Sequence, residues 1–194
     1  FSPGSDPDVQ LQLGRFLYSQ GLYREALGAF QLARQGEDAE VRVAARKGVV
    51  QSAVRVGDFG LARIEAITLI ADRPRDSDVI SLYGESMWAS GLFDVAESAF
   101  RDARALAPKD ARALNGLARA LSARGHQPEA LEHALAAVGL DSRDPEFHHT
   151  VGSIYERLGR YDLAAEALLR YLTLLPIGAR DDRYVELMAG VLPG

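Results

Sequence analysis

Apolar residues recur along the chain in short groups with the spacing of amphipathic helices. Residues 77–90 show the pattern, because an apolar stripe recurs there at a spacing of four residues and a polar stripe advances by steps of three, four and three residues. The apolar stripe comprises Val79, Ile80, Tyr83, Gly84 and Met87, and the polar stripe comprises Asp78, Ser81, Glu85 and Trp88. No apolar run approaches the roughly 18 residues of a membrane span, so we expect a soluble chain without membrane insertion.

The same pattern repeats and predicts five pairs of helices. The predicted pairs are 7–20 with 22–35, 39–56 with 58–72, 77–90 with 92–106, 111–124 with 127–140, and 145–158 with 161–174. Within each pair a glycine is followed five residues later by an alanine, and successive glycines lie 36, 34, 34 and 34 residues apart. The glycines are residues 21, 57, 91, 125 and 159. A fixed period of this length is typical of a small unit stacked on copies of itself.

Each recurring residue has a physical reason. Glycine accepts positive φ and lets the chain reverse after the first helix, and the alanine lets the second helix approach closely. Asp6-Pro7 and Asp144-Pro145 read as an N-cap followed by the first helical residue. Between the first two units, Gly36 is expected to stop one helix and Asp38 to cap the next, which predicts a longer first helix in the second unit.

The segments around the glycines, among them "SQGLYREALGAF" and "ASGLFDVAESAF", resemble the tetratricopeptide repeat family. At the small position of the first helix stand Gly14, Val50, Gly84, Ala118 and Gly152. At the aromatic position of the second helix stand Tyr23, Phe59, Phe93, Gln127 and Tyr161. Val50 and Gln127 depart from the family pattern. The resemblance implies an all-α fold, a right-handed α-solenoid of five helix-turn-helix repeats with a C-terminal capping helix.

The expected organisation is a flexible lead at 1–6, five repeats, and a final segment at 179–194. The repeats are 7–42, 43–76, 77–110, 111–144 and 145–178. Residues 181–191, "DDRYVELMAGV", are amphipathic and favour a capping helix, with a partial sixth repeat as the alternative. The chain starts without methionine, which is typical of a trimmed or processed chain.

Composition and motifs argue against several classes of function. The 22 Lys and Arg against 27 Asp and Glu give a net charge of −5, which opposes nucleic-acid binding. The chain has no cysteine, which suits any redox compartment and leaves the localisation open. The four histidines lack the spacing of a metal site, and no nucleophile elbow, zinc-protease or phosphate-loop motif is present. We therefore predict a protein that is not an enzyme and needs neither cofactor nor metal.

The resemblance implies that the polar stripes of the first helices line a concave groove that holds an extended peptide or a helix of a partner protein. The predicted groove residues are Arg15, Tyr18, Lys47, Gln51, Arg55, Glu85, Trp88, Arg112, Asn115, Arg119 and His149. Because basic residues outnumber acidic ones there, we expect a partner segment with acidic or carboxylate character. Trp88 is interpreted either as packing between helices or as a binding hot spot.

The leading hypothesis is thus a scaffold or adaptor that binds a protein. The alternative is a regulatory or oligomerising domain of a larger enzyme or secretion component, whose partner is another copy or another part of its own chain. A clamp for chaperone C-termini is disfavoured, since Leu82 and Gly116 stand where that subfamily has hydrogen-bonding side chains. RNA binding by related helical repeats would require a strongly basic groove. The alternating charges of the groove and the net acidity of the chain oppose it.

Overall fold

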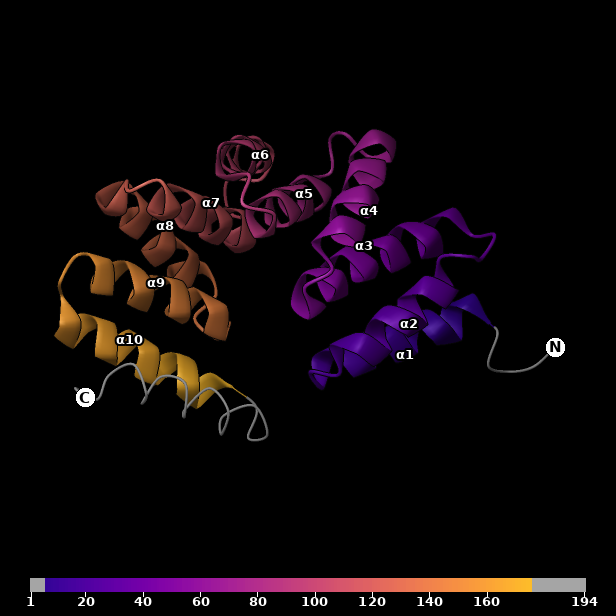
Figure 1. Ribbon diagram of the computed structural model, residues 1–194, viewed down its shortest axis with the longest axis horizontal. Helices are drawn as coiled ribbons and strands as arrows, with labels where there is room; N and C mark the ends of the chain where they lie inside the picture. The colour runs from indigo at the N-terminus through magenta and orange to yellow at the C-terminus, as the bar shows by residue number, and fades with distance from the viewer. Residues whose placement is uncertain (1–5, 176–194) are drawn as a thin grey trace. The chain divides into compact units, whose positions relative to one another are not determined.

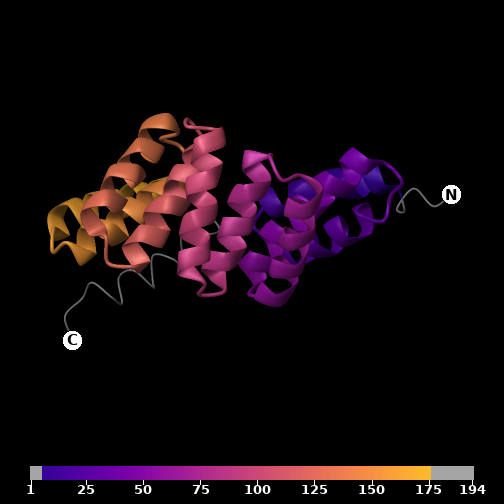
Figure 2. The same ribbon diagram turned by 90° about the horizontal axis from the view of Figure 1, so that it is seen from above.

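The computed structural model of the protein describes residues 6–175. Within that range the backbone forms ten α-helices and no strand, which confirms the all-α class. The helices divide into two compact units, with α1 to α6 before the boundary at Pro108 and α7 to α10 after it (Figures 1 and 2). Most of the predicted lead and the whole of the predicted capping helix at 179–194 lie outside the described residues.

The first unit consists of three consecutive helical hairpins. They pair α1 (Pro7–Ser19) with α2 (Tyr23–Ala33), α3 (Ala39–Val56) with α4 (Phe59–Asp72), and α5 (Ser77–Ala89) with α6 (Phe93–Leu106). Helices α1, α3 and α5 also contact one another in order, and we call them the first-helix layer of this unit. The core lies between consecutive hairpins, where Phe30, Val49 and Leu69 are buried.

The second unit has two hairpins of the same kind. They pair α7 (Ala111–Ala123) with α8 (Gln127–Leu140) and α9 (Pro145–Arg157) with α10 (Tyr161–Leu174). Helix α9 contacts α7, α8 and α10, so it is the central helix of the unit. Leu114, Ala137 and Phe147 join α7, α8 and α9 in a buried cluster. In both units consecutive hairpins stack as they do in an α-solenoid.

The predicted glycine turns are confirmed. All five glycines have positive φ, between 70° and 87°, and each stands after a first helix. The alanines five residues on are buried, four of them completely. Adding a Cβ at the turn glycines would meet nothing within 4 Å, so the positive φ rather than crowding requires glycine there.

Each first helix begins at an aspartate N-cap. Asp6 accepts a hydrogen bond from Asp8 N at 2.9 Å, and Asp144 accepts one from Glu146 N at 2.9 Å, as the Asp-Pro pairs predicted. Asp38 caps α3, which at 18 residues is longer than the 13-residue α1, α5, α7 and α9. These aspartates fix where the first helices start.

The size of the residue at the small position follows the size of the residue it faces on the second helix. A Cβ built on Gly14 would lie 2.7 Å from Phe30, one on Gly84 would lie 2.8 Å from Phe100, and one on Gly152 would lie 2.7 Å from Leu168. Where the second helix carries alanine instead, the first helix carries a larger residue, which gives the pairs Val50 with Ala66 and Ala118 with Ala134. Val50 is therefore compensated by its partner.

The second departure, Gln127, has a polar explanation. Its side-chain oxygen accepts a hydrogen bond from Ser122 Oγ at 2.8 Å, and its Nε2 donates to Ser122 O at 2.9 Å. Gln127 thus ties the start of α8 to the end of α7 by two hydrogen bonds. This is the contact between hairpin arms that an aromatic ring makes elsewhere, for example where Tyr23 meets Tyr18.

Candidate protein-binding surface

The structure places all eleven predicted groove residues on first helices. Arg15 and Tyr18 lie on α1, and Lys47, Gln51 and Arg55 lie on α3. The remaining members are Glu85 and Trp88 on α5, Arg112, Asn115 and Arg119 on α7, and His149 on α9. The structure brings those of α1, α3 and α5 together in the first unit, and those of α7 and α9 together in the second.

A cluster of aromatic and charged side chains joins α1, α2, α3 and α5 of the first unit. Tyr18 meets Tyr23 edge to face with ring centroids 5.1 Å apart, and the Arg55 guanidinium lies over the Tyr23 ring, 5.7 Å from its centroid. A cation at this distance from an aromatic face is attracted by the ring quadrupole. Tyr18 also shares a side-chain hydrogen bond with Arg55 and lies within the field of Glu85. We call Tyr18, Tyr23, Arg55 and Glu85 the tyrosine-arginine cluster.

Opposing influences act on the hydroxyl of Tyr18. Burial raises the pKa of the Tyr18 phenol, and the charge and hydrogen bond of Arg55 offset part of that rise. The nearby Glu85 carboxylate adds to it. The phenol therefore stays protonated at neutral pH and retains a hydrogen-bond donor beside an arginine.

Lys47 is engaged within the protein. Its Nζ lies 3.0 Å from Asp76 Oδ2 and 3.5 Å from Asp78 Oδ2, at the N-terminus of α5. Burial alone would raise the pKa of Asp76, but hydrogen bonds from Lys47 and from the N–H groups of Val79 and Asp78 outweigh it, so that pKa lies below its usual value. An acidic ligand at Lys47 would have to compete with two carboxylates.

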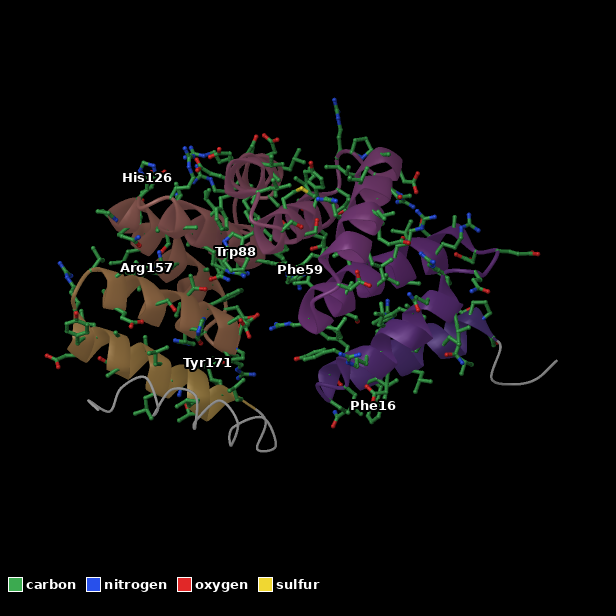
Figure 3. All side chains as sticks on the ribbon, in the orientation of Figure 1. Phe16, Phe59, Trp88, His126, Arg157 and Tyr171 are labelled. Atoms are coloured by element: carbon green, nitrogen blue, oxygen red, sulfur yellow. The ribbon has the colours of Figure 1, made fainter. Side chains whose placement is uncertain are left out.

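Trp88 packs against the start of its own second helix. Its ring meets that of Phe93 edge to face, with centroids 6.2 Å apart, and the side chain is half-buried. Trp88 is labelled in Figure 3. Aromatic pairs of this geometry contribute about 0.5–1.5 kcal/mol beyond their buried area. The contact supports a packing role for Trp88.

In the second unit the predicted residues differ in exposure. Arg112 is exposed, Arg119 and His149 are half-buried, and Asn115 is 5% exposed, with no hydrogen-bond partner for its Oδ1 among the described residues. His149 packs on Tyr171 of α10 with ring centroids 5.0 Å apart. The predicted residues of the second unit thus lie on two helices that contact each other, α7 and α9.

Comparison with known families decides the classification. Two tetratricopeptide repeat models match the sequence, one over residues 84–145 and the other over residues 145–176. The chain is a tetratricopeptide repeat protein. The matched residues run from α5 to α10.

Solved structures share the fold of this tetratricopeptide repeat protein. One is TTC0263, a thermophilic tetratricopeptide repeat protein of Thermus thermophilus, with a TM-score of 0.80 and 22% identity over 94% of this chain and 99% of that one. Another is MamA of Desulfovibrio magneticus RS-1, from residue 41 to its end, with a TM-score of 0.59 and 20% identity over 87% of this chain and 94% of that one. No curated protein matches the sequence.

Helical repeats of this family present side chains from successive first helices on one layer, which is the arrangement of a protein-interaction scaffold. Across residues 6–175 no three His, Asp or Glu side chains converge as a metal site would require. None of the helices described is long and apolar enough to cross a membrane.

Tyr23 is the one member of the tyrosine-arginine cluster that the predicted groove does not include. Tyr23 stands at the aromatic position of the second helix, which the family pattern treats as a packing position.

Proposed function

We propose that this tetratricopeptide repeat protein is a non-enzymatic adaptor that holds an acidic segment of a partner protein on the first-helix layer of its first unit. The observation that carries the proposal is the tyrosine-arginine cluster, in which Arg55 is exposed yet held over the Tyr23 ring. A guanidinium fixed in this way loses little conformational freedom when it binds a carboxylate.

Arg15 supports the same ligand chemistry. It is exposed on α1, next to α3, and makes no ion pair with any residue in the range 6–175. Arginine and tyrosine are enriched among residues whose truncation costs about 2 kcal/mol or more at protein interfaces. Arg15, Arg55 and Tyr18 therefore form the centre of the proposed binding surface, with Gln51 one turn from Arg55 as an amide that can orient the ligand backbone.

The test is a selection of displayed random peptides on the intact protein, followed by fluorescence anisotropy with the enriched peptides. We expect enrichment of Asp and Glu, and a loss of affinity of about 30-fold for Arg55→Glu, which corresponds to about 2 kcal/mol. The matched control is Arg63→Glu, an equal charge change at an exposed arginine of α4.

Circular dichroism of each variant establishes that helix content is unchanged. Enrichment without acidic residues would contradict the acidic ligand. Equal affinity of the acidic peptides for the wild type and for Arg55→Glu would show that the first-helix layer of the first unit is not the binding surface.

A further inference from the structure

An apolar cleft of about 600 Å³ lies in the second unit, lined by α8, α9 and α10. Val151 of α9 lines it and is 5% exposed, and Val138 and Ala167 line it from α8 and α10. At its rim Leu135 and Leu163 remain 45% and 39% exposed. The volume lies within the range of ligand sites, about 300–1,000 Å³.

The junction between the first two hairpins carries charged side chains at the corresponding repeat positions. Glu65 of α4, whose side chain is 8% exposed, pairs with Arg34 at the end of α2. Arg46 of α3 approaches the same carboxylate, with its Nε 3.9 Å from Glu65 Oε2. These three long side chains link the end of α2, α3 and α4 by ion pairs.

The second unit has no charged side chains like Arg34, Arg46 and Glu65 at the matching positions of its repeats. Counted from the first residue of its repeat, each member of the ion-pair network has a counterpart that lines the cleft. The matched pairs are Arg34 with Val138, Arg46 with His148, and Glu65 with Ala167. Two of the three replacements are short and apolar, and His148 is held by a contact of 3.0 Å between its Nε2 and Ser142 O. The cleft therefore lies where the second unit has no counterpart of this ion-pair network.

Two opposite charges stand at the edge of the cleft. Glu166 and Arg170 lie one turn apart on α10, line the cleft and are exposed. Neither side chain forms an ion pair with any residue between 6 and 175. An apolar cleft flanked by available charges of both signs complements a ligand with a large apolar anchor between an acidic and a basic group.

We propose that this cleft docks an amphipathic segment of a partner protein, with apolar side chains against Val138, Val151 and Ala167, a carboxylate at Arg170 and a basic side chain at Glu166. A peptide segment fits better than a small ligand because the exposed rim leucines extend the apolar surface beyond the cleft itself. The proposal is independent of the acidic-ligand surface in the first unit, so the protein has two docking sites.

The first experiment uses 1-anilinonaphthalene-8-sulfonate, which combines an apolar body with an anion. We expect saturable binding to the wild type and a loss of at least about tenfold in affinity for Val138→Arg with Ala167→Glu, which installs the ion pair of the first unit in the cleft. Leu140→Gln, an exposed apolar residue of α8 outside the cleft, is the control and should bind as the wild type does. Undiminished binding to the paired variant would overturn the proposal.

The second experiment selects displayed random peptides and does not depend on how well the paired variant folds. The exposed double variant Glu166→Arg with Arg170→Glu keeps the apolar lining and reverses the rim charges. Peptides selected on the wild type should share a large apolar residue flanked by opposite charges, and those selected on the charge-reversed variant should show the charges exchanged. Dye binding without peptide enrichment, or the same peptides on both proteins, would refute a peptide ligand. A dimer that dissociates in the paired variant would place a second copy of the chain there instead, which also overturns the proposal.

Discussion

Gly84 and Phe100 permit a test in which one substitution is expected to reverse the sign of its effect on stability. A Cβ on Gly84 would lie 2.8 Å from Phe100 Cε1 and 3.0 Å from its Cδ1, inside normal contact distance. Gly84→Ala gains about 1 kcal/mol of helix propensity, whereas overpacking of this kind costs about 1–3 kcal/mol. In the wild type we therefore expect a net loss of up to about 2 kcal/mol.

Removal of the ring reverses the balance. Phe100→Ala alone should cost about 3–5 kcal/mol of unfolding free energy. In that background Gly84→Ala meets no ring and retains the propensity gain, so it should stabilise by about 1 kcal/mol. The coupling between the two sites is then about 1–3 kcal/mol. The pair Ala118 with Ala134 already has this combination in the second unit.

Urea unfolding followed by tryptophan fluorescence is a suitable assay, because Trp88 is the single tryptophan of the chain and lies on the same helix as Gly84. Gly28→Ala is the control, since a Cβ on Gly28 meets nothing within 4 Å and Gly28 lies inside α2. It should stabilise by about 1 kcal/mol in both backgrounds. If Gly84→Ala has the same effect with and without the Phe100 ring, the size-matching explanation is wrong.

Three further predictions concern buried or capping carboxylates. Asp76→Asn keeps an N-cap but loses the charge that faces Lys47. Because the pKa of Asp76 is lowered in the folded state, this variant should be less stable at pH 7 by less than about 1 kcal/mol, and the difference should fade as the pH falls below about 4. Burial raises the pKa of Asp144, so Asp144→Asn should be more stable than the wild type at pH 7, with the gain lost below about pH 4. Glu65→Gln leaves Arg34 without its carboxylate and should cost about 1–3 kcal/mol.

These three predictions have direct measurements and controls. Denaturation at a series of pH values compares each aspartate variant with the wild type, with tryptophan fluorescence for Asp76→Asn and circular dichroism for Asp144→Asn. Equal effects at pH 3 and pH 7 would contradict both assignments. Glu40→Gln is the control for Glu65→Gln, because Glu40 pairs with Arg73 at the surface and its side chain is 76% exposed. A Glu65→Gln variant as stable as Glu40→Gln would show that burial adds nothing to the pair.

The sequence was sufficient to predict the hairpins, because local rules determine where they turn. Positive φ at Gly57 and the N-cap at Asp38 depend on only a few neighbouring residues. The match between Val50 and Ala66 was also present in the sequence. It becomes visible when the small position of each first helix is compared with the facing position of the second helix along all five repeats.

The contacts between hairpins could not be predicted in the same way. Lys47 pairs with Asp76 and Arg34 pairs with Glu65. Both contacts depend on how far one hairpin is rotated about its axis and shifted along it relative to the next hairpin. A repeat pattern defines which face of a helix is buried, but it does not define which long side chain reaches across. For the same reason the repeat pattern predicts that Lys47 is a groove cation, but it does not indicate that the carboxylates of Asp76 and Asp78 contact it.

Phe30 has a consequence for how such a chain can change by duplication. Its ring touches the sites of Gly14 in its own hairpin and Gly48 in the next, where an added Cβ would lie 2.7 Å and 2.6 Å away. A copied repeat inserted after the first would have to bring its own glycine to the site of Gly48. The hairpins are therefore not interchangeable segments, and unequal exchange between them would preserve folding only when the matching glycine is carried along.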